Sequence, residues 1–262
     1  MENKTFSRLV PLDGGINFRD LGGYRSRDGR TLKWRKLLRC GHLAALTDTD
    51  LDSLKAIGVS RVHDFRREDE QSQSPTRPVR AEIVDDYQMS IGDISRFWEF
   101  LAEGALSAET SHHLVVNSYR NCIESVIPAY SRFMRYLVDT DGGVDVFHCS
   151  AGKDRTGMAA ALVLAALDIP RQTIVEDYLL TLEYYNSDKL IAIVEGHLRD
   201  AGVEKWDRSW LIPYCSVHAD NINGFLDAID QKYGNIKNYL VQGLGMSSQD
   251  IEKLKDKYLQ SE

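Results

Sequence analysis

The order of hydrophobic and polar positions divides the chain into two parts of different character. Between residues 40 and 170, short β-branched runs alternate with stretches in which apolar residues recur every three or four positions. The runs at 59–65, 82–84 and 144–147 predict strands, and the stretch at 118–138 predicts a helix. This alternation indicates an α/β fold, in which a central sheet carries helices on both faces.

Local signals mark where some of these elements begin and end. Residues 47–50 resemble a capping box and Gly58 stands where a helix C-cap belongs, so we expect a helix between them. Paired glycines and an Asp28-Gly29 turn predict a β-hairpin region over residues 16–40. Residues 66–80 are polar and include two prolines, which predicts a loop.

The second half of the chain is helical in pattern. The helix expected at 156–167 is apolar nearly all round, which indicates that it is buried. Apolar residues at helical spacing predict further helices at 174–182, 188–199 and 222–233, and another after a cap at 247–250. We therefore expect a helix-rich C-terminal half.

Two segments carry no clear pattern. Residues 93–117 suggest a short helix followed by a mobile connection at 104–113, and residues 206–213 within the segment 186–214 suggest irregular structure. The chain shows neither an internal repeat nor a low-complexity linker. We therefore expect one domain over residues 1–262, in which 93–117 and 186–214 are lid or insertion segments.

Composition narrows the class of protein. Of the 262 residues 43% are hydrophobic, and no apolar run approaches the roughly 18 residues that span a bilayer. The polar N-terminus lacks the apolar core of a signal peptide, and the scattered cysteines fit reduced thiols. We expect a cytoplasmic protein without an integral membrane segment, although the sequence leaves export without a signal peptide open. The cysteines are Cys40, Cys122, Cys149 and Cys215.

Charge is unevenly spread. The net charge of −7 does not favour nucleic acid as a partner. Residues 19–39, however, hold eight basic side chains against two acidic ones. This segment is either a solvated hairpin or a patch that steers an anionic substrate. The basic residues are Arg19, Arg25, Arg27, Arg30, Lys33, Arg35, Lys36 and Arg39.

The ten residues from His148 to Gly157 hold the strongest functional signal. They lie between a predicted strand and a predicted helix, where free backbone N–H groups and the positive helix end favour an anion. The same field stabilises the thiolate of a cysteine at the start of the loop, which is Cys149. After five intervening residues comes Arg155, whose planar fork can bind two phosphate oxygens at once.

These residues predict hydrolysis of a phosphoester through a covalent intermediate. Cys149 is the expected nucleophile, the N–H groups of 150–155 form the cradle, and Arg155 supplies charge to the transition state. Gly152 permits the tight turn, and Thr156 can hydrogen-bond the Cys149 sulfur. This chemistry requires neither a metal nor another cofactor. The expected phosphate-binding residues are Ser150, Ala151, Gly152, Lys153, Asp154, Arg155 and Thr156.

At this point the sequence resembles a known family. Cys-x5-Arg is the signature of the cysteine-dependent protein tyrosine phosphatases. Residues 148–157 look like the longer motif of a bacterial, atypical dual-specificity and lipid phosphatase branch, typified by mycobacterial secreted phosphatase B and listerial LipA. Residues 17–24, 39–46 and 64–66 are similar to further motifs of that branch, and 233–245 to its C-terminal helices. The resemblance implies a phosphomonoesterase acting on phosphotyrosine, with phosphoserine, phosphothreonine and phosphoinositides as further substrates.

The acid that protonates the leaving oxygen is expected inside the loop. Many tyrosine phosphatases use an aspartate on a separate loop before the cysteine, but here the corresponding position, near residue 117, carries no carboxylate. Asp154 resembles the aspartate that this branch carries inside its loop, and it is the favoured acid; the alternative is a scaffolding role. Asp64, which follows a neighbouring strand, is expected to orient Arg155 or Lys153, or to cap the loop after its strand.

Three other functions fit parts of the sequence. A dedicated phosphoinositide phosphatase is supported by Lys153, Asp154 and the basic segment 19–39. A sulfurtransferase also places a cysteine between strand and helix, but residues 155–157 argue against it. A non-catalytic phosphate-binding module is disfavoured by the intact nucleophile and arginine. The expected partners are a phosphorylated protein or a phosphoinositide, with inorganic phosphate bound in the loop and no nucleic acid.

Overall fold

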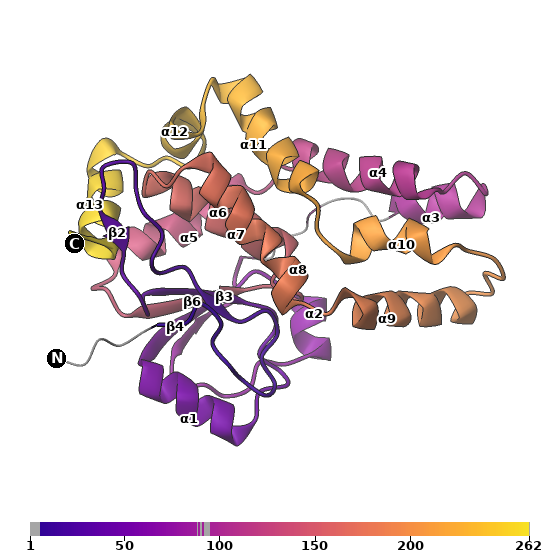
Figure 1. Ribbon diagram of the computed structural model, residues 1–262, viewed down its shortest axis with the longest axis horizontal. Coiled ribbons are helices and arrows are strands. Elements are labelled where there is room, and N and C mark those ends of the chain that lie inside the picture. Colours follow the sequence, from indigo (N-terminus) through magenta and orange to yellow (C-terminus); the bar gives the residue numbers. More distant parts are fainter. Residues whose placement is uncertain (1–5, 88, 90, 92–94, 262) are drawn as a thin grey trace.

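A five-stranded sheet forms the centre of the computed structural model, which describes residues 6–87, 89, 91 and 95–261 (Figure 1). The strands lie in the order β1-β3-β6-β4-β5, all parallel except β1, which pairs antiparallel with β3. Their bounds are β1 (Arg19–Asp20), β3 (Leu37–Cys40), β6 (Val144–His148), β4 (Val59–Asp64) and β5 (Glu82–Val84). The three strands predicted from β-branched runs are confirmed.

Alternate residues of the central strand β6 face two different cores. Val144 and Val146 join a cluster that includes Leu54 of α1 (Asp48–Ile57). Phe147 points the other way, into the larger cluster that includes Phe133 of α5 (Ile127–Asp139). This two-residue period is that of a strand buried on both faces, so the predicted α/β fold with helices on both sides is confirmed.

The ends of α1 follow the predicted signals. Thr47 and Asp50 form a capping box, in which the Thr47 hydroxyl accepts from the Asp50 N–H and the Asp50 carboxylate accepts from the Thr47 N–H. Gly58 ends the helix with φ of 84°, a left-handed conformation that favours glycine.

The helix α6 (Asp154–Ala166) is buried on nearly every side. From Thr156 to Ala166 each of its residues is buried, and many of them are alanine. Small side chains let the helix lie close to the sheet while three other helices pack on it, namely α7 (Arg171–Leu179), α11 (Ala219–Tyr233) and α13 (Ser248–Tyr258). The apolar pattern over 156–167 therefore predicted its burial correctly, and this rigid helix holds the loop that precedes it.

Most of the remaining elements are helices. Those predicted at 188–199, 222–233 and after 247 are confirmed. The elements still to be named are α2 (Glu68–Gln73), α3 (Ser95–Ala102), α4 (Ala108–Asn121), α8 (Thr181–Tyr184), α9 (Ser187–Asp200), α10 (Arg208–Cys215), α12 (Ile236–Asn238), a π-helical turn (Tyr239–Gly243), β2 (Thr31–Leu32) and β7 (Leu259–Gln260).

Three segments that were not expected to be helical contain helices, and the single helix predicted over 118–138 is divided between α4, which ends at Asn121, and α5, which begins at Ile127. Helix α2 forms inside 66–80, where a loop was expected, because Glu70 accepts a hydrogen bond from the Arg67 N–H and starts the helix without a conventional cap residue. Helix α4 begins at Ala108, inside the expected mobile connection, because the Ser107 hydroxyl accepts from the Thr110 N–H. The third is α10, which forms in the stretch expected to be irregular and accommodates a proline within the helix.

The prediction of a β-hairpin over residues 16–40 is only partly confirmed, because the strands of this region do not all pair with one another. Strands β1 and β3 pair antiparallel, as a hairpin requires. Strand β2, which lies between them in sequence, instead pairs with β7 at the C-terminus. The sequence could not show this pairing because the two strands stand at opposite ends of the chain.

Four helices, α3, α4, α9 and α10, extend away from the sheet in Figure 1. Phe97, Ile191, Leu198 and Leu211 pack together there in a hydrophobic cluster separate from the two cores of the sheet. The cluster joins most of the two segments predicted to be lids or insertions, although residues 93–94 lie outside the described part of the chain. Among the described residues, none of the helices combines the length and hydrophobicity needed to cross a membrane.

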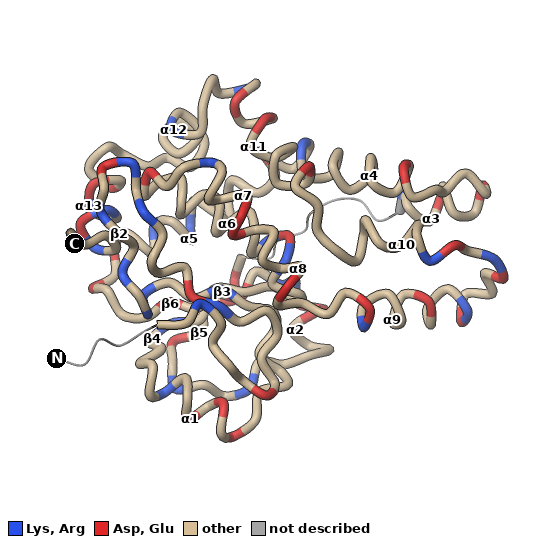
Figure 2. The backbone as a smooth tube through the Cα atoms, viewed as in Figure 1, with Lys and Arg blue, Asp and Glu red and all other residues tan. Residues whose placement is uncertain are grey.

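Neither reading of the basic segment 19–39 describes the structure well. Arg19 and Arg39 are fully buried, so they belong neither to a solvated hairpin nor to an exposed patch. Arg30 pairs with Asp256, and Figure 2 shows basic positions near β2 beside acidic positions of α13. Charged side chains of this segment therefore contact other parts of the protein instead of forming one exposed basic patch.

Candidate active site

The loop from Cys149 to Arg155 joins the carboxyl end of β6 to the N-terminus of α6, as predicted. Cys149 is buried, with 2% of its surface exposed. In a parallel sheet covered on both faces, this edge is where ligands bind. The predicted strand–loop–helix arrangement is thus present and places the cysteine at the sheet edge.

The loop carbonyls are bound on the outside of the turn. The Ser150 carbonyl accepts from the His42 N–H at 2.9 Å, and the Gly152 carbonyl accepts from Asn17 Nδ2 at 3.0 Å. Among the described residues, the N–H groups of 150–155 have no acceptor. Because the carbonyls of the loop are engaged behind it, its N–H groups are available to an anion at its centre.

A buried cluster of charged side chains, Arg19, Arg39 and Asp177, binds the loop. Arg39 donates to the Gly152 carbonyl at 2.9 Å and to the Asp177 carboxylate at 2.6 Å. Arg19 donates to the Asn17 side chain and to the Asp177 carbonyl. Burial disfavours the charge of Asp177, but the charges of the two arginines lower its pKa nonetheless. The N-terminal motif, residues 17–24, therefore helps to hold the loop in place through Asn17 and Arg19.

Gly152 has to be glycine for two reasons. Its φ of 68° lies in the left-handed region, and a Cβ there would stand 2.3 Å from the carbonyl carbon of Cys40. The prediction that Gly152 permits the turn is therefore confirmed, and the close approach to β3 adds a second constraint.

The guanidinium of Arg155 is held by Glu70 of α2. Nη1 donates to Oε2 and Nη2 donates to Oε1, each at 2.7 Å, and Nη1 also donates to the Met89 carbonyl at 3.2 Å. Among the described residues, Arg155 Nε and the second N–H of Nη2 have no acceptor. Glu70 thus fixes one edge of the fork and leaves the other edge for two phosphate oxygens.

Glu70 is the functional side chain that sequence reasoning missed. Its carboxylate also accepts from the Ser150 hydroxyl at 2.5 Å, so it joins both ends of the loop. Burial opposes its ionisation, but the hydrogen bonds and charge of Arg155 lower the pKa of Glu70 to about 2. The sequence carried no clear local signal for it, because a capping box begins with Ser or Thr and the residue three positions before Glu70 is Arg67.

Replacement of Glu70 by glutamine should reduce stability and turnover together. A glutamine presents an N–H to Arg155 where the carboxylate presents an acceptor, so we expect kcat to fall about tenfold. The pKa of Glu70 is lower in the folded protein than its usual 4.5, so its stabilisation is complete above pH 4.5. That contribution is lost as the pH falls toward about 2.

Denaturant unfolding of the parent and Glu70→Gln between pH 2 and 7 measures this contribution. The difference in unfolding free energy should be largest at neutral pH and shrink below pH 4.5. Asp69→Asn, on the same helix and paired with Arg67 instead, is the control for kcat. A constant stability difference across this range would show that the ion pair with Arg155 contributes nothing.

Asp154 lies at the mouth of the loop and is one-third exposed, at 33%. Its Oδ1 accepts from the Tyr119 hydroxyl at 2.6 Å, and its Oδ2 lies 3.5 Å from Lys153 Nζ. Tyr119 in turn lies 2.8 Å, oxygen to oxygen, from Tyr178. Burial and the nearby Asp154 raise the pKa of Tyr119, so this hydroxyl stays protonated and orients the carboxylate.

Lys153 is turned away from the centre of the loop. Its Nζ donates to the carbonyls of Tyr214 at 2.6 Å and Ser216 at 3.1 Å, at the end of α10. Only 5% of the side chain is exposed. The lysine therefore ties the loop to α10, and in this arrangement it adds no charge for a multiply phosphorylated substrate.

Asp64 contacts neither Arg155 nor Lys153 in the described part of the chain. Its carboxylate binds Arg66 on two sides, at 2.9 Å to Nε and 2.7 Å to Nη2, and accepts the Arg66 N–H. It also lies 3.7 Å from His148 Nε2. Asp64 therefore caps the loop after its strand, which is the alternative that the sequence allowed.

The Thr156 hydroxyl is buried and has no hydrogen-bond partner in the described part of the chain. The expected hydrogen bond to the Cys149 sulfur is therefore absent. A buried hydroxyl without a partner costs about 1–3 kcal/mol.

Comparisons with known proteins show which family this chain resembles. Residues 10–260 match the model described as the tyrosine phosphatase family. A tyrosine-protein phosphatase of Nostoc commune is 30% identical over 219 residues, 83% of this chain and 72% of that protein. The triple specificity protein phosphatase PtpB of Mycobacterium tuberculosis is 24% identical over an alignment of 282 positions, which covers 93% of this chain and 96% of that protein. The crystal structure of P. aeruginosa TpbA in complex with pTyr, 16% identical, covers 80% of this chain and 96% of its own, with a TM-score of 0.32.

Proposed function

We propose, because the chain belongs to the tyrosine phosphatase family, that it hydrolyses phosphotyrosine through a cysteinyl-phosphate intermediate. The family makes it a phosphomonoesterase, as the resemblance in its sequence implied. The observation that carries the mechanism is the loop itself. Its carbonyls are bound outside, its N–H groups are free of acceptors among the described residues, and Cys149 stands at its start.

The first step transfers the phosphoryl group to sulfur. The Cys149 thiolate attacks phosphorus, and the bond from phosphorus to the tyrosyl oxygen breaks. The loop N–H groups and the open edge of Arg155 stabilise the equatorial oxygens as they gain charge. Asp154 donates its proton to the leaving oxygen, which departs as the neutral phenol.

The second step restores the enzyme. A water molecule attacks phosphorus and gives a proton to the Asp154 carboxylate, while the bond from phosphorus to sulfur breaks. Inorganic phosphate leaves and the thiolate of Cys149 is regenerated. Apart from the attacking water, both steps use groups of the protein.

Asp154→Asn should slow poor leaving groups most. A phenolate that leaves easily needs little protonation, whereas a poor one depends on the acid, and we expect a loss of about 10²-fold there. Aryl phosphates of graded phenol acidity give the plot of log kcat against leaving-group pKa that measures this dependence. The plot should be steeper for Asp154→Asn than for the parent.

Asp64→Asn is the matched control for that series. Since Asp64 binds Arg66 and caps its loop, its loss should slow good and poor leaving groups alike. A steeper plot for Asp64→Asn, with Asp154→Asn parallel to the parent, would reverse the two roles. Parallel plots for all three proteins would mean that the acid comes from elsewhere, such as the segment 93–117.

The substrate of this site is proposed to be phosphotyrosine in a protein. The case for a dedicated phosphoinositide phosphatase rested on Lys153, Asp154 and the basic segment 19–39. Lys153 is bound to α10, and Arg19 and Arg39 are buried beneath the loop. A panel of phosphotyrosine, phosphoserine and phosphothreonine peptides with soluble phosphoinositides tests this, because one relative is named a triple specificity phosphatase. A higher kcat/KM for a phosphoinositide than for every phosphopeptide would contradict the proposal.

The lid role of 93–117 and 186–214 is part of the same proposal. The ties of Lys153 to the Tyr214 and Ser216 carbonyls place the end of α10 beside the loop. Helices with a hydrophobic cluster of their own can move as a unit relative to the sheet. We expect substrate entry to depend on this movement.

A further inference from the structure

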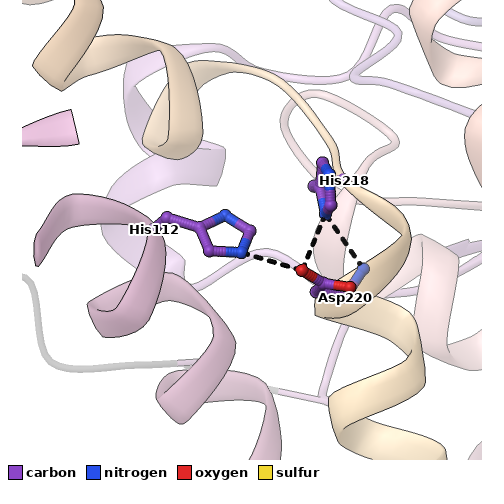
Figure 3. A group of neighbouring side chains, drawn as sticks. All are labelled: His112, His218 and Asp220. Carbon is purple, nitrogen blue, oxygen red and sulfur yellow. Dashed lines mark hydrogen bonds and ion pairs between the residues drawn. The ribbon is translucent and has the colours of Figure 1, made fainter. Parts of the chain in front are cut away.

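Three side chains outside the active site converge on one point. His112 lies on α4, and His218 and Asp220 lie at the start of α11, 108 residues later in the case of Asp220 (Figure 3). His112 Nε2 lies 3.0 Å from Asp220 Oδ2, and His218 Nδ1 lies 3.1 Å from the same oxygen. One potential ligand atom from each residue lies within 4.8 Å of the others.

We propose that His112, His218 and Asp220 bind a divalent transition metal ion, with Zn²⁺ as the best fit. Two imidazole nitrogens and one carboxylate oxygen are ligands that zinc prefers, and three protein ligands leave a fourth position for water. Donor atoms bonded to tetrahedral zinc at about 2.0–2.2 Å lie about 3.3–3.5 Å apart. The two measured distances to Asp220 are close to that value, and small side-chain adjustments bring the imidazoles together.

The exposure of the three side chains also suits a metal ion. His218 Nδ1 lies 3.2 Å from the Asp220 N–H as the cap of α11. A metal ion binds the neutral imidazole and would replace this cap bond. The two rings are perpendicular, with centroids 4.8 Å apart, and all three side chains are at least partly exposed. An ion can therefore enter from solvent.

The site would join two helices that support the catalytic loop. His112 is followed two turns later on α4 by Tyr119, which donates to Asp154. Asp220 is followed directly by Asn221, whose amide donates to the Tyr178 hydroxyl at 3.4 Å. A zinc ion at this point fixes α4 against α11 beside the contacts that orient Asp154. The ion would stabilise the contact between α4 and α11 and would take no part in the reaction.

Zinc binding to the full-length Cys149→Ser protein tests the proposal. Removing the thiol prevents zinc from binding at the active site instead. Calorimetry with ZnCl₂ should show one ion per chain. With free zinc at 100 times Kd, the Tm should rise by about 5–10 °C.

Two variants in that background assign the ligands. His112→Ala should weaken zinc binding about tenfold or more, and Asp220→Asn should do the same while keeping a side chain that can adopt a similar shape. His113→Ala removes the neighbouring, more exposed histidine, which pairs with Glu109, and should leave the Kd within about twofold. The Tm without zinc identifies any variant that is simply less stable.

Two results would overturn the proposal. The first is the absence of saturable one-to-one zinc binding in the parent. The second is an equal loss of affinity in His112→Ala and His113→Ala, which would indicate general binding by surface histidines. Neither result bears on the phosphatase proposal, because the test uses a protein without the nucleophile.

Discussion

Cys149→Ser should abolish turnover of an aryl phosphate while the protein stays folded. Serine keeps the shape of the side chain but its hydroxyl remains protonated, so the nucleophile is lost. We expect kcat to fall by roughly 10⁴-fold or more, as when other covalent nucleophiles are removed. Steady-state kinetics with 4-nitrophenyl phosphate measures the loss.

Phosphate binding should survive the same change. The loop N–H groups and Arg155 do not depend on the sulfur, so phosphate should still raise the Tm of Cys149→Ser. Cys122→Ser is the matched control, because Cys122 is buried but its Sγ contacts the Tyr119 carbonyl and not the loop. Turnover by pure Cys149→Ser within tenfold of the parent would exclude the covalent mechanism.

Arg155→Lys should keep the positive charge and still lose most of the activity. Lysine cannot bind Glu70 with one edge and two phosphate oxygens with the other, as the guanidinium can. We expect kcat to fall by about 10³-fold, a loss typical of an arginine that stabilises a transferring phosphoryl group. The loss should appear mainly in kcat, because this contact strengthens in the transition state.

Separate measurement of kcat and KM distinguishes this role from simple binding. Arg132→Lys, an exposed arginine on α5 that pairs with Asp86, should leave both constants nearly unchanged. A rise in KM with kcat preserved in Arg155→Lys would make Arg155 a residue for ground-state binding only.

The loop could be predicted because its chemistry is local in sequence. Cys149, Gly152 and Arg155 lie within seven consecutive residues, and a strand before them and a helix after them define the geometry. The caps of α1 and α13 could be predicted for the same reason, since the interacting residues stand three positions apart.

The parts that sequence could not give depend on distant contacts. Glu70 reaches Arg155 across 85 residues, and it does so only because α2 forms where the composition indicated a loop. Asp177 binds Arg39 across 138 residues. Part of the basic segment 19–39 therefore belongs to a buried cluster of charged side chains that binds the loop. His112 and Asp220 meet across 108 residues, and the spacing of neither residue suggests a metal ligand.

The most direct test of the covalent mechanism is to trap the phosphoryl group on the enzyme. Parent protein is mixed with excess aryl phosphate, quenched within one turnover, digested and examined by mass spectrometry. The mechanism predicts one phosphoryl group on the peptide that contains Cys149, carried by the sulfur, and a burst of phenol equal to the enzyme concentration. A burst with the phosphoryl group on another residue, or single-turnover release of phosphate and phenol at the same rate with Cys149 unmodified throughout, would contradict it.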